Sequence, residues 1–329
     1  MAIISKINNI ALASMSKLQG VSMASVGKFG GVSRTSNQPS IITANLVQHL
    51  DAGDSNSYSG TGTNWYDLTT NNVDGTFRGS PTYSSTDGGG SFYFDGVDDG
   101  IKFDYDDAAP IRVGEDSGEV DCISSPNSCT RTYGNLSTYG GFSYQAWVKQ
   151  VYTNGTPQAF MPFGNNNSVT STEASSNRYK YYQGIEIDLG GGGQVICFFF
   201  DGNGGNAGGD RRDRRTTNNV LDTYANSWVN IAIVAIGDSI TNNLTDQIKI
   251  YIQGTEVSSY ATSTGTGSGL GYRSKFQSTQ SQPYHAGVAL RRGSFLKGYL
   301  SQQLVYNNDL TSTEVLQNFN ATKTRYGYS

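Results

Sequence analysis

Apolar and polar residues alternate in three short repeats at the start of the chain. Residues 4–14, 15–25 and 26–36 align as three copies of 11 residues, and a lysine stands at the third position of each copy. Each copy has a central pair, Asn-Asn, Gln-Gly or Gly-Gly, of residues that accept positive φ, with apolar residues on both sides. An 11-residue period also fits about three helical turns, but glycine disfavours a helix. The pattern therefore predicts three successive β-hairpins.

An array of 33 residues buries little apolar surface by itself. We therefore expect residues 1–36 to be an assembly element that completes its core against other protein, in a homo-oligomer for which three hairpins suggest a trimer. A signal peptide fits less well because Lys6, Asn8 and Asn9 interrupt the apolar run, and glycine disfavours an amphipathic membrane helix. The expected interface residues are Ile4, Ile7, Ile10, Leu12, Met15, Leu18, Val21, Met23, Val26, Phe29 and Val32.

After a linker at 37–40, the rest of the chain, 41–329, reads as a long series of strands. Residues 247–252 alternate between polar and apolar, whereas 231–236 are almost wholly apolar and are expected to form a central strand. Ten or more strands without intervening helices predict an antiparallel sandwich of two sheets. The expected strands lie within 42–52, 91–103, 142–152, 159–164, 181–190, 194–202, 228–237, 247–260, 285–292 and 296–307.

One helix is predicted near the end of the chain. Thr311 and Glu314 have the spacing of a capping box, in which each side chain binds the other residue's backbone N–H. We expect the helix to run to about Thr324 and to end near Gly327. The expected staple and apolar face consist of Leu310, Val315, Leu316 and Phe319.

The composition fits an all-β protein with many turns. Glycine makes up 41 of 329 residues, and charged residues make up 15 % against about 25 % in a typical domain. The net charge of −4 gives no reason to expect nucleic-acid binding. No stretch approaches the length of about 18 apolar residues that a membrane-spanning helix needs. Such composition is typical of robust extracellular or virion proteins.

Cysteine, histidine and arginine add smaller constraints. A local disulfide between Cys122 and Cys129 is sterically feasible, and Cys197 is expected to be a buried thiol. The odd cysteine count and the lack of an export signal predict synthesis in a reducing cytosol, and two histidines speak against His-based sites. The arginines of 211–215 are expected in a solvated loop, with contact to an anionic partner as the alternative.

Several longer segments resemble a known family. Residues 45–58 (ending in LDAGDSNSY), 63–77 (TNWYDLTTNNVDGTF) and 89–103 (GGSFYFDGVDDGIKF) resemble the opening of laminin-G-like, concanavalin A-like jelly-roll domains, and 298–327 resembles their closing strand and helix. The version with both ends is common in virion proteins of tailed bacteriophages, where similar short repeats precede it. The resemblance implies a jelly-roll domain whose first and last strands pair. It places four aromatic residues as core anchors: Trp65, Phe94, Trp147 and Trp228.

The concanavalin A-like fold also houses glycoside hydrolases, one family of which carries a Glu-x-Asp-x-(x)-Glu strand. Glu186 and Asp188 match its first two acids, with Cα atoms about 7 Å apart in a strand. Gly190 and Gly191 occupy the positions where the second glutamate would stand. A retaining hydrolase needs a nucleophile and an acid, so we expect no enzyme and assign no catalytic residue.

Two binding sites remain as expectations. Asp95, Asp98 and Asp99 offer oxygens that suit Ca²⁺, or they bond backbone N–H groups of their own turn. The glycine-rich segment 201–210 lacks the bidentate glutamate of a calcium loop and is expected to be a flexible loop. The candidate sugar-stacking residues, which are equally suited to a protein interface, are Tyr179, Tyr181 and Tyr182.

The expected function is that of a structural virion protein, assembled in the host cytoplasm. Its repeats would anchor it to other virion proteins or to copies of itself, and a lectin-like sandwich would be displayed, as a capsid decoration or a fibre component. The alternative is a glycan-binding host-adhesion module of a tail fibre, and a glycoside hydrolase fits less well. Neither nucleic acid nor membrane is expected as a partner.

Overall fold

The computed structural model describes most of the chain after residue 38, and within 1–38 it describes six two-residue strands. The described part is all-β apart from short 3-10 segments and the α-helix α2 (Ser312–Thr322). No helix in this part is long and apolar enough to span a membrane. The described ranges after residue 38 are 39–103, 141–151, 158–165, 183–190, 192–201, 211–236, 248–263, 284–286, 288–289 and 294–329.

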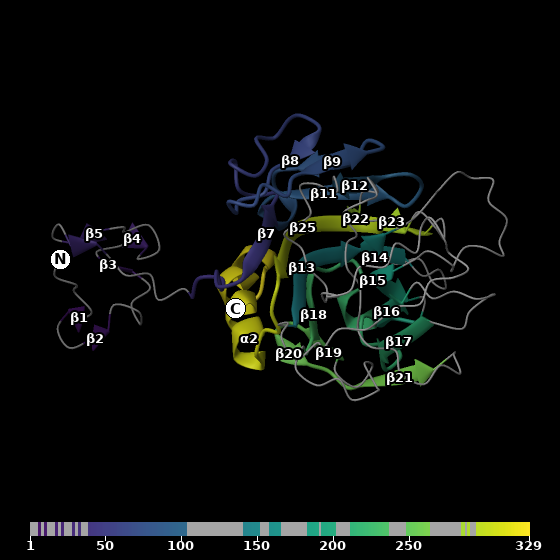
Figure 1. Ribbon diagram of the computed structural model, residues 1–329. Coiled ribbons are helices and arrows are strands. Elements are labelled where there is room, and N and C mark those ends of the chain that lie inside the picture. Colours follow the sequence, from purple (N-terminus) through teal and green to yellow (C-terminus); the bar gives the residue numbers. More distant parts are fainter. Residues whose placement is uncertain are drawn as a thin grey trace.

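An eight-stranded antiparallel sheet is the largest layer (Figure 1). Its order is β10-β11-β25-β13-β18-β19-β20, and β7 also pairs with β25. The almost wholly apolar segment at 231–236 supplies most of β18, which lies inside the sheet as predicted. The strands are β7 (Leu46–Asp51), β10 (Thr82–Ser84), β11 (Ser91–Asp95), β13 (Phe142–Gln150), β18 (Val229–Ala235), β19 (Ile248–Ile252), β20 (Thr255–Glu256) and β25 (Lys297–Tyr306).

A second antiparallel sheet has five strands in the order β14-β15-β16-β17-β21. Its central members include the arginine-rich segment that was expected to be a solvated loop, and that prediction is wrong. The apolar strand β16 pairs with β15 on one side and leaves backbone groups on the other, which β17 satisfies. Pairing with β16 therefore makes this segment a strand, although its charged composition predicts a loop. The strands are β14 (Gln158–Asn165), β15 (Gln183–Gly190), β16 (Gln194–Asp201), β17 (Arg211–Thr216) and β21 (Ser259–Ser263).

Smaller sheets complete the described part of the sandwich. A four-stranded sheet has the order β22-β12-β9-β8, and β23 pairs with β24. Strands β8, β9 and β10 were not predicted, because they are only two to four residues long and too short to show an alternation of polar and apolar residues. The strands are β8 (Asn64–Trp65), β9 (Gly75–Arg78), β12 (Gly100–Phe103), β22 (Tyr284–Ala286), β23 (Val288–Ala289) and β24 (Ser294–Phe295).

One hydrophobic core joins these sheets and confirms the predicted antiparallel sandwich. Alternate residues of β18, such as Ile231 and Ile233, share this core with Ile187 of β15 and Cys197 of β16. The predicted anchors Trp65 and Phe94 are fully buried in it. Cys197 is the buried thiol that was expected.

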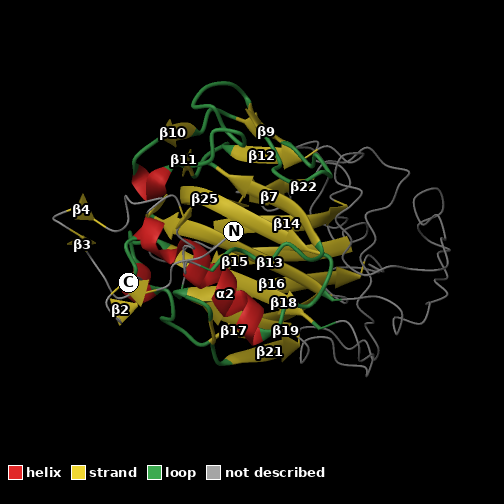
Figure 2. Cartoon of the chain, turned by 90° about the vertical axis from the view of Figure 1, so that its left-hand side faces the viewer, coloured by secondary structure: helices red, strands yellow, loops and turns green. Residues whose placement is uncertain are grey.

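The outer face of the eight-stranded sheet is covered in part by α2, which lies across the strands (Figure 2). The other two predicted anchors, Trp147 and Trp228, are buried here rather than in the main core. Trp147 stacks on Tyr326 with ring centroids 4.0 Å apart and donates its Nε1–H to Thr322 at 2.8 Å. The closing segment of the chain therefore has its own aromatic cluster.

Helix α2 begins as predicted. Thr311 is the N-cap, and the capping box with Glu314 is formed on both sides. The α-helix ends at Thr322, two residues before the expected end, and a 3-10 turn carries the chain to Gly327. Gly327 has a φ of 88°, a left-handed conformation that favours glycine at a helix end.

The apolar face of α2 differs from the prediction at one position. Leu316 is 42 % exposed, whereas Val315 and Phe319 are buried as expected. The third inward position is polar: Asn318 accepts a hydrogen bond from Ile42 N (2.7 Å) and donates to Gln145 Oε1 and Tyr306 Oη (both 3.0 Å). Asn318 therefore ties the beginning of the sandwich to its last strand and helix.

The two ends of the sandwich meet, as the resemblance implied. β7 pairs with β25 along its length. Beside this pairing, Arg325 donates to both carboxylate oxygens of Asp51, at 2.6 and 2.8 Å. Its other nitrogens bond Ser301 Oγ and the carbonyls of Gly88 and Gly90. One guanidinium therefore joins the first strand, the last strand and the turn before β11.

Arg325→Met should lower the free energy of unfolding by about 3 kcal/mol, because it leaves the poorly exposed carboxylate of Asp51 without its partner. Denaturant titration measures this loss. The matched control is Lys249→Met, which removes the exposed ion pair with Glu256 and should cost less than about 1 kcal/mol. Equal effects of the two substitutions would show that the Arg325 contacts add nothing beyond a surface ion pair.

Burial lowers the pKa of His49, although the nearby carboxylates of Asp51 and Asp67 oppose the shift. The folded state thus favours the neutral ring, and this contribution to stability is lost as the pH falls below about 6.5. His49→Gln should make the acid-side decline in the free energy of unfolding shallower, as measured by urea titrations at a series of pH values. Identical slopes for the variant and the wild type would contradict the assignment.

Candidate functional site

Three separate two-stranded hairpins form in the N-terminal repeats, as predicted (Figure 1). Each connects its strands through the central residue pair of the repeat. Among the described strands, none of the six pairs with a sheet of the sandwich. The strands are β1 (Lys6–Ile7), β2 (Ile10–Ala11), β3 (Lys17–Leu18), β4 (Val21–Ser22), β5 (Lys28–Phe29) and β6 (Val32–Ser33).

The register of the three hairpins is the same. In each, the pair next to the turn is apolar, and the next pair joins the lysine to a small residue, alanine or serine. Directly opposed residues share a face of a strand pair, and successive pairs alternate between faces. Each hairpin therefore has an apolar position on one face and a lysine position on the other. The apolar pairs are Ile7–Ile10, Leu18–Val21 and Phe29–Val32.

Six of the eleven predicted interface residues thus occupy equivalent hairpin positions. The other five, Ile4, Leu12, Met15, Met23 and Val26, lie outside the described residues. The sandwich itself shows how one of the turn pairs closes a hairpin. Gln253 and Gly254, the same dipeptide as in the second repeat, join β19 to β20 with φ values of 53° and 73°.

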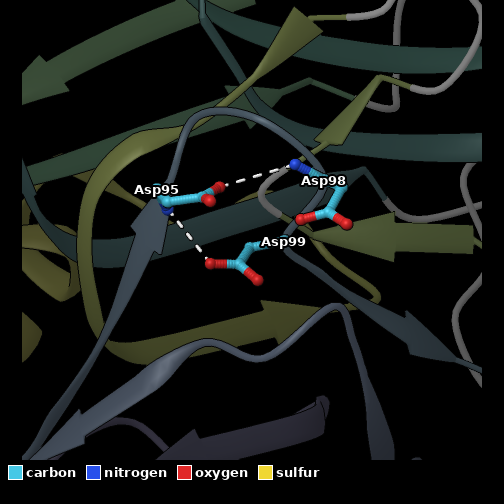
Figure 3. Close-up of side chains that lie close together, drawn as sticks. All are labelled: Asp95, Asp98 and Asp99. Carbon is cyan, nitrogen blue, oxygen red and sulfur yellow. Dashed lines mark hydrogen bonds between the residues drawn. The ribbon is translucent and has the colours of Figure 1, made fainter.

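The predicted calcium residues come together in the turn between β11 and β12. Figure 3 shows Asp95, Asp98 and Asp99 side by side. One carboxylate oxygen of each lies within 4.8 Å of those of the other two. Such a group of oxygens is able to hold a hard cation. Asp98 is exposed and Asp99 is buried.

Two of these carboxylates also stabilise the turn itself. Asp99 accepts the N–H groups of Ser80 at 2.7 Å and of Asp95 at 3.1 Å. Asp95 in turn accepts the N–H of Val97 at 2.8 Å. These bonds correspond to the second interpretation of the sequence, in which aspartates satisfy the backbone of their own turn.

The two acids of the hydrolase-like strand lie in β15. Their neighbours Ile187 and Leu189 are buried in the core, so Glu186 and Asp188 hold positions on the opposite face of the sheet. Gly190 ends the strand, and a Cβ added there would lie 2.9 Å from Ile196 Cδ1. Because Cδ1 is the far end of a flexible side chain, a larger side chain at this place requires only a shift of Ile196.

The predicted sugar-stacking residues Tyr179, Tyr181 and Tyr182 lie outside the described residues, as do Cys122 and Cys129. Within the described part, a different aromatic group comes together on the outer face of the eight-stranded sheet. Tyr93 of β11 pairs directly with Tyr299 of β25, with ring centroids 4.9 Å apart. Both tyrosines alternate with buried residues in the sequence, but their contact depends on strand pairing across 206 positions, which no local pattern reveals.

No protein-family model and no curated protein sequence matches the chain. Among solved structures, the chain is similar to the binding domain of botulinum neurotoxin DC, crystallised in complex with rat synaptotagmin II, with 11 % sequence identity and a TM-score of 0.50. It is also similar to the binding domain of Paraclostridial Mosquitocidal Protein 1, with 17 % identity and a TM-score of 0.50.

These matches cover 85 % and 84 % of this chain but 52 % of each binding domain, so the chain spans about half their length. At such low identity the similarity establishes the fold alone. The sandwich therefore shares its fold with these two binding domains.

Asp99→Ala should lower the free energy of unfolding by about 2 kcal/mol, because two backbone N–H groups lose a charged acceptor. Asp98→Ala, at the exposed position of the same group, should change it by less than about 0.5 kcal/mol. Thermal unfolding of both variants and the wild type, with and without added calcium, measures this. If the acids serve only the turn, calcium leaves the wild-type melting temperature unchanged. A calcium-dependent rise that Asp98→Ala abolishes would contradict this.

Proposed function

We propose that the chain is a non-catalytic structural component of a bacteriophage virion, which its N-terminal repeats attach to the particle. In this proposal, residues 1–36 are the attachment segment, 37–40 a linker and 41–329 a displayed carbohydrate-binding sandwich. Capsid decoration or membership of a fibre both fit such a role. The observation that carries the proposal is the set of three hairpins with identical register.

The hairpins need a partner for a physical reason. A strand pair of two residues each presents one apolar pair and has no second layer of its own to cover it. Three hairpins of the same register favour a partner with three equivalent sites, as in a symmetric oligomer or several copies of one particle protein. In residues 12–16, between the first two hairpins, the chain reaches at most about 20 Å, which limits the spacing of such sites.

Charge adds to this argument. Residues 1–36 contain four of the 23 basic residues and none of the 27 acidic ones. Residues 37–329 therefore hold 19 basic and 27 acidic residues, a formal net charge of −8. The attachment segment is thus suited to an acidic partner surface, and the sandwich of a second copy is itself acidic.

The sandwich supports a binding role rather than a catalytic one. Its fold is shared with the toxin binding domains, and Gly190 and Gly191 stand where the hydrolase family that it resembles in sequence carries its second glutamate. The same arrangement serves the alternative of a tail-fibre module that adheres to a host glycan, because display and glycan binding are compatible in one chain.

Replacing one apolar residue in each hairpin by aspartate (Ile7, Leu18 and Phe29) should prevent attachment, because a charge in each apolar pair opposes its burial. The measurement is the fraction of full-length chain that co-purifies with virus particles. Sedimentation of the purified chain without particles measures its oligomeric state. The expected result is loss from the particles with unchanged thermal unfolding of the sandwich.

The matched control introduces the same three charges at the serines that end the repeats (Ser14, Ser25 and Ser36). It separates the loss of apolar contact from the change in charge and should remain attached. Retention of the hairpin variant on the particles, at the level of the control, would overturn the attachment role.

A further inference from the structure

We propose that the sandwich binds a neutral saccharide on the outer face of the eight-stranded sheet, at a row formed by Thr82, Tyr93, Tyr299 and Lys149. This inference rests on the proposed carbohydrate-binding role and adds to it a location and a class of ligand. The row shares no residue with the predicted tyrosines at 179–182 or with the acidic turn.

The row is continuous across four neighbouring strands. Thr82 pairs with Tyr93, Tyr93 with Tyr299, and Tyr299 with Lys149, each directly across a strand pair. Residues paired in this way share a face. Phe92, which neighbours Tyr93 along β11, is buried in the core, so the row lies on the face away from it. Thr82 is exposed and both tyrosines are half-buried.

Lys149 is fixed in place at one end of the row. Its ammonium lies 4.1 Å from the ring centroid of Tyr299 and 5.4 Å from that of Trp228. It forms an ion pair with Asp87, whose second oxygen accepts the Trp228 Nε1–H at 3.0 Å. Little ordering entropy is therefore lost when a ligand binds this group.

The closing segment of the chain covers the sheet next to Lys149, so the row is accessible from its other end, at Thr82. Trp228, next to Lys149, is buried with Trp147, Phe319 and Tyr326. Figure 2 shows α2 across the middle of the sheet, away from β10 and β11. The aromatic strip therefore runs from a covered part of the sheet to an uncovered part, where Thr82 is exposed.

The chemistry of the row matches a sugar. Tyrosine rings offer apolar surface with a polar edge, and a sugar ring has C–H groups on its faces and hydroxyls around its rim. Asp87 and Thr82 flank the rings with groups that accept or donate hydrogen bonds to hydroxyls. A few placed polar groups around aromatic surface are the usual composition of a small-molecule site.

Charge decides which sugar is favoured. The ammonium of Lys149 is already neutralised by Asp87, so the row has no spare cation for an acidic group. Residues 37–329 carry a formal net charge of −8, which disfavours approach of an anionic glycan. A neutral saccharide avoids both costs.

The test uses the full chain on an array of neutral and acidic glycans, followed by calorimetric titration with the strongest neutral ligand. Tyr93→Ala and Tyr299→Ala should each weaken binding about tenfold or more, equivalent to about 1.4 kcal/mol. The matched control is Tyr66→Ala, which removes a tyrosine that is 48 % exposed elsewhere on the sandwich, and it should bind as the wild type does.

A second variant guards against misfolding. Thr82→Arg changes an exposed residue beside Tyr93 and should weaken binding by covering the ring without altering thermal unfolding. If the wild type binds a neutral glycan and the Tyr93, Tyr299 and Thr82 variants bind it equally well, the location is wrong while the carbohydrate-binding role stands. Binding of acidic glycans alone would overturn the ligand class. A wild type that binds no glycan at all would overturn the carbohydrate-binding role itself.

Discussion

The bond between Asp51 and Arg325 is the contact on which the closure of the sandwich depends. It joins residues 274 positions apart, and the same guanidinium holds Ser301 of the last strand and two carbonyls before β11. A strand at each end of a jelly roll has to be kept against its neighbour by something other than local sequence, because closing so long a segment costs chain entropy. At that point one guanidinium nitrogen of Arg325 donates charge-assisted hydrogen bonds to both carboxylate oxygens of Asp51.

The remaining contacts of the closing segment reinforce this bond. Asn318 holds the backbone of Ile42, and Trp147 stacks under Tyr326. Helix α2 therefore covers part of one face of the large sheet, and Tyr93 and Tyr299 beside this covered part are half-buried. The element that stabilises the fold thus also borders the proposed saccharide-binding row.

The chain combines two parts with different physical requirements. The sandwich satisfies its own apolar residues in one shared core. The hairpins repeat a minimal unit with one apolar pair, and residues 1–36 carry four basic residues ahead of an acidic domain. Such a division suits a protein that is attached at one end and binds with the other.

The sequence by itself determined the elements with strong local signals. Turn-forming pairs and period-two alternation placed the hairpins and most strands, and Thr311 with Glu314 placed the helix start, because these patterns depend on neighbours in the chain. The sequence misplaced Leu316, because the inward position of α2 is taken by Asn318, whose bonding partners lie on remote strands. It also misplaced the arginines of β17, because that segment becomes a strand only by pairing with β16. Only the tertiary structure brought Asp51 to Arg325 and Tyr93 to Tyr299. The physical reason is that strand pairing between remote segments is decided by which partners fill a common core, and no short pattern contains that information.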